Sequence, residues 1–313
     1  MDGPLSRPRA VPPPGATAFT TVLTELHDAR RARLLPPKLY LPDSPPRGLI
    51  LFSHGLGGSR EGGSLWLSHW AHQGLAGLAV QHPGSDATLL AGASPLALRR
   101  ALRNAMTPEA LTRRAEDLAF VLTRIGHDTA LPPSLHNIRA IGLCGHSFGA
   151  VTVQLLAGER RPCQPAFPAD PRVHAALALS PSARQVHAEH PLATRFGNIR
   201  LPFLSITGTR DDGMGPSDIT AAQRELPYRH MPPGKKYLLV FEGGTHLDFA
   251  GQASTAERGL AGLPSRLPPF HDRLLNASSA FWHAHLAGDT LALNWLDNQC
   301  RAQLRPNDRF ETK

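Results

Sequence analysis

Short apolar runs alternate along the chain with longer segments in which apolar residues recur every three or four positions. The first pattern is typical of buried strands, and the second is typical of helices that pack on a sheet. The apolar runs are Phe19–Leu26, Leu34–Leu41, Leu49–Phe52, Leu75–Val80, Ile138–Leu143, Ala175–Leu179, Phe203–Thr207 and Tyr237–Phe241. The alternation predicts an α/β fold with a mostly parallel eight-stranded sheet and helices on both faces.

Two of the connecting helices have clear ends in the sequence. We expect Ser64 to cap the first, and Thr107 and Pro108 to open the second, which Gly126 ends. The stretch 84–104, after the fourth predicted strand, is irregular and rich in apolar residues. It predicts either a lid or acyl pocket over the carboxyl ends of the strands, or an ordinary helix that covers a sheet edge.

The length and composition favour one folded unit. A chain of 313 residues with 41% hydrophobic residues can bury one large core, so we expect a single domain over 19–313. The Pro-rich opening, 1–18, predicts a flexible lead-in. It has no apolar core of the secretory type, and no later run is long enough to cross a bilayer. The sequence therefore predicts a cytoplasmic location and no transmembrane segment.

The net charge of +8 raises the question of a nucleic-acid partner. Such a partner needs a clustered basic face with a binding motif, and none is visible. The densest cluster is Arg30, Arg31 and Arg33, which we expect to be a solvated stretch entering a strand. The 3 cysteines and 16 histidines lack the spacing of metal ligands. We therefore expect no nucleic acid, no metal and no other cofactor.

The segment Gly145-His146-Ser147-Phe148-Gly149 matches the motif G-x-S-x-G and stands between an apolar run and a helical segment. A sharp strand-to-helix turn at this point holds the serine in strained torsions and exposes its hydroxyl. Glycines flank it because a Cβ there would collide with neighbouring backbone. The motif predicts Ser147 as a nucleophile.

A serine hydroxyl needs a base, which a carboxylate in turn orients. His246 follows the last predicted strand on a Gly-rich loop, and it is the histidine best placed to be that base. Asp211 and Asp212 follow the preceding strand; the usual turn length favours Asp211, and Asp212 is the alternative. Asp248 and Glu242 are too close to His246 in sequence to reach around its ring, so we expect them to be structural.

The negative oxygen of a tetrahedral intermediate needs two preorganised donors. One is expected to be the backbone N–H of Phe148, and the other the N–H of Leu56 in the Gly-rich segment 53–58. A phosphate-cradling turn is the alternative for that segment, but it lacks both G-x-G-x-x-G and a P-loop lysine. We expect His54 to brace this loop and not to react.

These segments are similar to a known family. GHSFGA, SHGLGG, QHPGSD, TGTRDD and EGGTHLDF resemble the dienelactone-hydrolase-like branch of the α/β-hydrolase superfamily, and the first two also resemble platelet-activating-factor acetylhydrolases and polyester hydrolases. The resemblance implies the α/β-hydrolase fold, with the roles given above for Ser147, Asp211, His246, Leu56 and Phe148. Classical dienelactone hydrolases have a cysteine where this chain has Ser147, so the resemblance does not imply their substrate.

The expected function is therefore a serine esterase that cleaves small to medium carboxylic esters through an acyl-enzyme. An alternative is an acyl hydrolase directed at lipids or polyesters, with apolar groups such as Trp66 and those of 84–104 in contact with the acyl chain. A third possibility is a non-catalytic binding module, which would need the set of serine, histidine and aspartate to be incomplete. The sequence leaves the physiological ester, the acyl-chain preference and the oligomeric state open.

Overall fold

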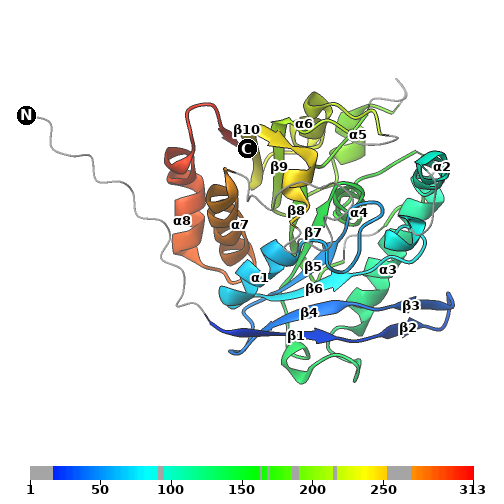
Figure 1. Cartoon of the computed structure of the whole chain (residues 1–313). Coiled ribbons are helices and arrows are strands. Elements are labelled where there is room, and N and C mark those ends of the chain that lie inside the picture. The colour runs from blue at the N-terminus through cyan, green and yellow to red at the C-terminus, as the bar shows by residue number, and fades with distance from the viewer. Residues whose placement is uncertain are drawn as a thin grey trace, which may run out of the picture.

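Nine strands form one sheet through the middle of the molecule, in the order β1-β4-β6-β5-β7-β8-β9-β10-β11 (Figure 1). The structure is a computed structural model that describes residues 17–90, 95–162, 164–167, 170–184, 190–213, 217–251 and 269–313. The strands are β1 Phe19–Leu23, β4 Lys38–Pro42, β5 Leu49–Ser53, β6 Ala76–Val80, β7 Ile141–His146, β8 Val173–Leu179, β9 Phe203–Arg210, β10 Lys236–Thr245 and β11 Arg309–Thr312.

The six central strands of this sheet, β6 to β10 with β5 among them, run parallel to one another. Strands β1 and β4 at one edge and β11 at the other are antiparallel to their neighbours. The expected α/β class with a mostly parallel sheet is confirmed.

The predicted number of eight strands is wrong, because β11 adds a ninth at the β10 edge. Strand β11 is only four residues long and buries one apolar side chain, Phe310, between charged neighbours. It therefore leaves no apolar run in the sequence.

The two opening runs are also shorter in the structure than predicted. Each divides into a sheet strand and one arm of a separate hairpin, formed by β2 (Leu26–Asp28) and β3 (Arg33–Leu35). The consecutive residues Pro36 and Pro37 separate β3 from β4. Because proline has no N–H to donate to a neighbouring strand, the run could not continue as one paired strand.

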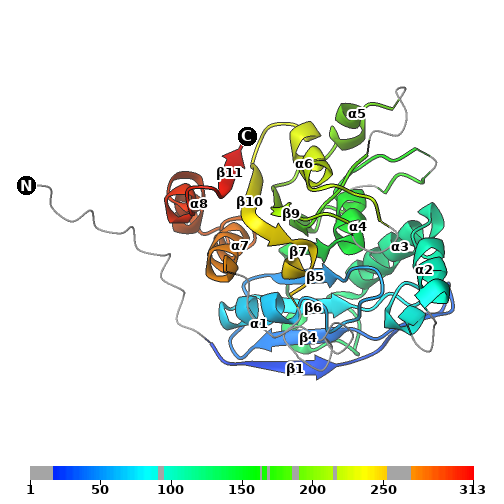
Figure 2. The same cartoon turned by 45° about the horizontal axis from the view of Figure 1, so that its top comes forward.

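Helices cover both faces of the sheet (Figure 2). Helices α1, α7 and α8 pack on one face, and α3, α4, α5 and α6 on the other. The helix bounds are α1 Ser64–His72, α2 Pro95–Asn104, α3 Pro108–Arg124, α4 Phe148–Leu156, α5 Leu192–Phe196, α6 Ala221–His230, α7 His271–His285 and α8 Thr290–Asn298.

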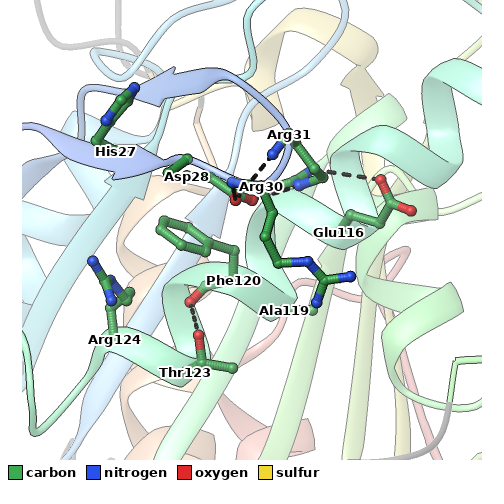
Figure 3. A pocket seen from close by; sticks show the side chains of 10 residues that line it. His27, Asp28, Arg30, Arg31, Glu116, Ala119, Phe120, Thr123 and Arg124 are labelled. Atoms are coloured by element: carbon green, nitrogen blue, oxygen red, sulfur yellow. Dashed lines mark hydrogen bonds and ion pairs between the residues drawn. The ribbon is translucent and has the colours of Figure 1, made fainter.

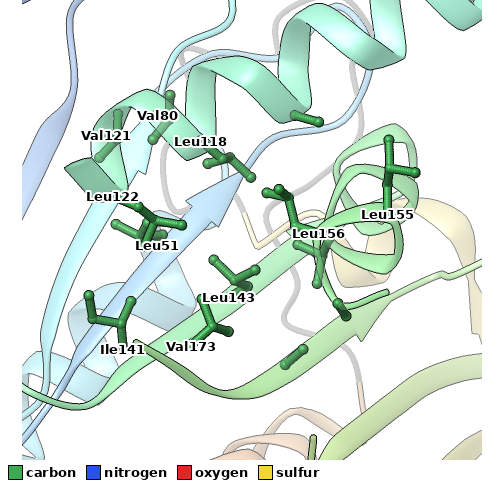
Figure 4. Packing of buried hydrophobic residues seen from close by; sticks show 14 of the residues in the cluster. Leu51, Val80, Leu118, Val121, Leu122, Ile141, Leu143, Leu155, Leu156 and Val173 are labelled. Carbon is green, nitrogen blue, oxygen red and sulfur yellow. The ribbon is translucent and has the colours of Figure 1, made fainter. Parts of the chain in front are cut away.

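The side chains of β5 alternate between these two layers. Leu49 and Leu51 belong to the apolar cluster under α3 and α4, which Figure 4 shows from close by, and Ile50 and Phe52 belong to the cluster under α1 and α7. Each such side chain contributes about 1.5–3 kcal/mol through burial. Burial on both faces explains why the strand reads as one unbroken apolar run.

The predicted ends of α3 are confirmed, whereas the cap of α1 is corrected. Thr107 caps α3 by accepting a hydrogen bond from the N–H of Ala110 at 3.2 Å, and Pro108 follows it. In α1 the N-cap is Gly63, not Ser64, with a φ of 73°. A Cβ on Gly63 would lie 2.5 Å from the ring of Phe52, so only glycine fits between the helix start and the strand.

Two sequence expectations concern segments at the periphery. Residues 1–16 of the predicted lead-in lie outside the described residues. The stretch 84–104 contains a 3₁₀ turn, Ala87–Leu90, and α2, which packs on it. In Figures 1 and 2, α2 lies beside α3. The lid and the edge-covering helix both stay predictions.

Parallel strands bring their carboxyl ends to one edge of a sheet, where ligands bind in open α/β folds. In this chain the segments that follow β5, β7, β9 and β10 meet at that edge. They carry Leu56, Ser147, Asp211 and His246, in that order.

Candidate active site

Ser147 occupies the turn between β7 and α4, with a φ of 55° and a ψ of −115°. A residue with a Cβ is strained at positive φ by about 1–3 kcal/mol and persists there only where its surroundings hold it. The N–H of Ser147 donates to the carbonyl of Leu179 in β8 at 2.9 Å, and its own carbonyl accepts from Val151 at 3.1 Å. The turn leaves Ser147 half-buried, whereas the strand residues before it are buried.

The two flanking glycines are required by close backbone contacts. A Cβ on Gly149 would lie 2.6 Å from the carbonyl carbon of Ser53 and 2.7 Å from the carbonyl oxygen of His54. One on Gly145 would lie 2.9 Å from the nitrogen of Ala150. The expectation that a Cβ would collide with backbone at both positions is confirmed.

His246 lies at the end of β10 with its ring between Ser147 and Asp211. Its Nε2 is 2.9 Å from Ser147 Oγ, and its Nδ1 is 2.7 Å from Asp211 Oδ1. Its carbonyl accepts a hydrogen bond from Nε2 of His146 at 3.0 Å. Burial, with the nearby His246, lowers the pKa of His146 well below its usual value, so His146 supports the loop as a neutral donor.

Of the two candidate acids, the structure brings Asp211 to His246. Asp211 is fully buried, and its second carboxylate oxygen accepts from the hydroxyl of Thr207 at 2.7 Å. Asp212 is exposed and accepts from the N–H of Ala221, at the start of α6, at 3.0 Å.

Neither of the other two carboxylates near His246 in sequence contacts its ring. Asp248 accepts from the N–H and hydroxyl of Thr245 at 2.8 and 2.7 Å, which fixes the turn that carries His246. Glu242 is exposed.

Arg224, on α6, lies against this group and was not predicted from the sequence. It is buried, and it donates to the carbonyls of Asp211 at 3.1 Å and Ser180 at 3.0 Å. Its Nε is also 3.3 Å from Asp211 Oδ1. Burial lowers the pKa of Arg224, and the carboxylates of Asp211 and Asp212 act in the opposite direction.

The position of Arg224 helps to assign the proton on His246. Nδ1 of the imidazole is 2.7 Å from the Asp211 carboxylate and 3.1 Å from Arg224 Nη2, and it cannot serve both. A carboxylate needs a donor, whereas a guanidinium needs an acceptor. The shorter contact places the proton on Nδ1, so Nε2 is left with a lone pair that faces the hydroxyl of Ser147.

The two segments that carry the predicted oxyanion donors lie next to this serine. Within the described part of the chain, the N–H groups of Leu56 and Phe148 donate to no other residue. Phe148 opens α4, whose N-terminal amides favour negative charge. The segment that carries Leu56 is adjacent, since a Cβ on Gly55 would lie 3.5 Å from Cβ of Ser147.

A second serine–histidine–aspartate arrangement, which was not predicted from the sequence, lies deeper in the molecule. His82 is 3.0 Å from Ser53 Oγ through Nε2 and 3.0 Å from Asp117 Oδ2 through Nδ1. Ser53, His82 and Asp117 are all completely buried. No substrate can reach Ser53, so similar distances alone do not make a reactive serine.

The basic cluster of Arg30, Arg31 and Arg33 is only in part the solvated stretch that was expected, because Arg30 alone of the three is exposed. Arg31 and Arg33 form ion pairs with the buried carboxylate of Asp117 at 2.9 and 2.8 Å. The expectation fails for these two because a carboxylate far along the chain, on α3, needs their charges once it is buried.

A cavity of about 570 Å³ lies between the β2–β3 hairpin and α3, away from Ser147 (Figure 3). Of the three arginines in its wall, Arg31 pairs with Asp28 and Glu116, Arg124 pairs with Asp128 at 2.8 Å, and Arg30 is exposed. The residues that line the cavity do not include those of the candidate site.

Within the described residues, no three histidine, cysteine or acidic side chains are placed to hold a metal ion. The helices described there also include none that is long and apolar enough to cross a bilayer. No protein-family model and no curated protein matches the sequence.

Proposed function

We propose that this chain is a serine hydrolase of the α/β-hydrolase fold that cleaves carboxylic esters through an acyl-enzyme. The observation that carries the proposal is the continuous contact from Ser147 Oγ to His246 Nε2 at 2.9 Å, and from His246 Nδ1 to Asp211 Oδ1 at 2.7 Å. It involves a half-buried serine in a strained turn, which distinguishes it from the fully buried Ser53 arrangement.

In the first half-reaction, His246 Nε2 accepts the hydroxyl proton as Ser147 Oγ attacks the ester carbonyl carbon. The carbonyl oxygen becomes an oxyanion, which the N–H groups of Leu56 and Phe148 stabilise. When the tetrahedral intermediate collapses, the bond to the alkoxy group breaks, and His246 returns the proton to the departing alcohol. Asp211 stabilises the imidazolium that exists between these two proton transfers.

In the second half-reaction, water attacks the acyl carbon and His246 accepts its proton. Collapse of the second intermediate releases the carboxylic acid and returns the proton to Ser147. Each oxyanion donor contributes roughly 100-fold or more to such a rate. Nothing in this sequence of steps requires a cofactor.

The test compares the half-buried arrangement at Ser147 with the fully buried arrangement at Ser53 within one chain. Ser147→Ala is expected to lower the turnover of p-nitrophenyl acetate by at least about 1,000-fold, because it removes the nucleophile. Ser53→Ala is the matched control and is expected to lose stability, about 1–3 kcal/mol, through its unpaired buried partners. A fluorophosphonate should label wild-type protein and Ser53→Ala at residue 147, and should not label Ser147→Ala. Unchanged turnover by Ser147→Ala, or labelling at Ser53, would refute the proposal.

The proposal favours small and medium acyl groups, and a lipid- or polyester-directed activity is the alternative. Trp66 does not support that alternative, because it is fully buried and its Nε1 donates to the carbonyl of Phe249 at 3.1 Å. Leu247, next to the base, is 52% exposed and offers an apolar surface for an acyl chain. A series of p-nitrophenyl esters of increasing chain length, run beside a short-acyl phospholipid, separates the two by the position of the maximum in kcat/KM.

A further inference from the structure

Arg114, in the middle of α3, is a buried cation without a direct carboxylate partner. Its exposure is 1%, and among the described residues no acidic side chain forms an ion pair with it. Burial lowers its pKa to about 9, which leaves the guanidinium charged at neutral pH. A buried charge of this kind is unfavourable unless neighbouring hydrogen-bond acceptors stabilise it. Arg114 is therefore held by the groups that it contacts.

Those groups belong to the segments that carry the two proposed oxyanion donors. Arg114 donates to the carbonyl of His54, two residues before Leu56, and to Ser53 Oγ at 3.1 Å. On the other side it donates to Thr152 Oγ1 at 3.2 Å, and its guanidinium lies 5.0 Å from the ring centroid of Phe148. One rigid fork therefore joins the loop after β5 to the first turn of α4.

A third contact extends to the loop after β6. Arg114 Nη1 donates to Ser85 Oγ at 2.7 Å, and the carbonyl of Ser85 accepts from the N–H of Gly57, next to Leu56, at 2.9 Å. The loop that carries Leu56 is thus fixed from both of its sides.

The surrounding polar groups have one consistent set of donors and acceptors. Asp117 accepts from Nδ1 of His82, so Nε2 of His82 accepts from the hydroxyl of Ser53, whose oxygen is free to accept from Arg114. Nε2 of His54 accepts from the N–H of His82 at 3.1 Å, so its Nδ1 donates to the carbonyl of Gly55 at 2.6 Å. Desolvation lowers the pKa of both histidines, to about 4 for His82, and both are neutral as this assignment requires.

We infer that Arg114 is the positioning residue of the oxyanion hole, because it fixes the amides of Leu56 and Phe148 relative to each other and to Ser147. The inference rests on the proposed function. Arg114 itself does not touch the reacting atoms; it acts through the two segments that it joins. Lysine cannot replace it, because the compact ammonium lacks the planar set of N–H donors with which the guanidinium reaches both segments at once.

The decisive variant is Arg114→Lys, with Arg114→Met beside it. We expect kcat to fall about 10- to 100-fold with KM little changed. Displaced amides stabilise the oxyanion of the transition state less well, whereas binding of the substrate is unaffected. Arg195→Lys is the matched control: Arg195 is also buried, but it pairs with Glu159, which lies beyond the C-terminal end of α4 and not at the turn that carries Phe148. It is expected to change stability and to leave kcat close to wild type.

A pair of substrates, an ester and the thionoester with sulfur in place of the carbonyl oxygen, separates a positioning role from a merely structural one. Sulfur is larger and accepts hydrogen bonds weakly, so a well-placed amide pair favours the oxygen ester. In Arg114→Lys, the ratio of kcat/KM for the oxygen ester to kcat/KM for the thionoester should fall toward the ratio of the rates at which hydroxide hydrolyses the same two esters in solution. In Arg195→Lys this ratio should stay at the wild-type value. A folded Arg114→Lys with wild-type kcat and wild-type ratio would overturn the inference.

Amide hydrogen exchange at Gly57 and Val151, hydrogen-bonded amides of the segments that carry the two proposed donors, makes the two proposals independently testable. Exchange at both positions should accelerate in Arg114→Lys and not in Arg195→Lys, whether or not the wild-type protein hydrolyses the ester. Absence of Ser147-dependent turnover in the wild type would remove the proposed function and, with it, the oxyanion role. Unchanged exchange in Arg114→Lys would remove the positioning role alone.

Discussion

The proton on His246 depends on the chemistry of a single neighbouring side chain. The Asp211 carboxylate can only accept, so it keeps the imidazole proton on Nδ1 and leaves Nε2 free to accept the proton of Ser147. An amide at the same position would offer an N–H and could stabilise the opposite tautomer.

We therefore predict that Asp211→Asn lowers kcat by about 10,000-fold with little change in fold, because the wrong nitrogen then carries the proton. Asp212→Asn is the matched control, because its side chain still accepts from the N–H of Ala221 and has no contact with His246. Steady-state kinetics of the two variants side by side check the prediction. Equal losses, or a larger loss in Asp212→Asn, would contradict the assignment of Asp211.

Candidate residues that belong to a local motif can be recognised in the sequence, whereas those that only the fold brings together cannot. Ser147 and His246 stand beside glycines at the ends of apolar runs, and these signals are readable along the chain. Arg224 and Arg114 have no such signal, because a lone arginine on an amphipathic helix is ordinarily exposed. Their burial depends on oxygen atoms from segments far away in sequence.

At the scale of elements, the turn between β7 and α4 can form only because it lies directly against the end of β5. Gly149 packs on the carbonyls of Ser53 and His54, with no space for a side chain. The same contact brings the loop that carries Leu56 to Ser147. The turn that carries Ser147 and the loop that carries Leu56 are therefore one packing unit.

We expect Gly149→Ala to destabilise the protein by at least about 3 kcal/mol, because the added methyl overlaps backbone that cannot move without separating the two elements. Gly74→Ala is the control: Gly74 has a φ of 78° but nothing within 4 Å of an added Cβ, so its cost should be about 1 kcal/mol. Urea unfolding of both variants measures the difference. A Gly149→Ala protein no less stable than Gly74→Ala would show that this contact is loose.

The strands that the sequence predicted and those that it missed differ in burial. Strands such as β5 and β6 are buried at every position, and their sequences produce apolar runs without a charged residue. The edge strand β11 buries one residue of four, and its pairing with β10 comes from backbone hydrogen bonds that any sequence can make. The hairpin of β2 and β3 is equally short, and its boundaries depend on the ion pairs of Arg31 and Arg33 with α3.

For the molecule as a whole, buried neutral histidines link stability to pH. His82 is completely buried, and desolvation lowers its pKa from the usual 6.5 to about 4. Below pH 6.5 the unfolded chain therefore binds a proton at this position that the folded chain does not. Stability is fully present above that pH and decreases as the pH falls toward 4.

The predicted loss from His82 alone is on the order of 3 kcal/mol between about pH 6.5 and 4. His82→Asn, whose amide takes the place of Nδ1 and can still donate to Asp117, should reduce the slope of unfolding free energy against pH by up to one proton over this range. Urea unfolding at a series of pH values for the two proteins provides the measurement. Parallel curves would mean that His82 is protonated in the folded state.

The proposed mechanism requires that Ser147 becomes covalently acylated during ester hydrolysis. Acyl transfer can be trapped by acid quench of the wild-type protein during turnover of an activated ester with a bulky, slowly released acyl group, followed by mass spectrometry of its peptides. We expect one acyl group per chain, located on Ser147, with none in Ser147→Ala. Hydrolysis that proceeds with no acylated peptide, or with the acyl group on another residue, would contradict this mechanism.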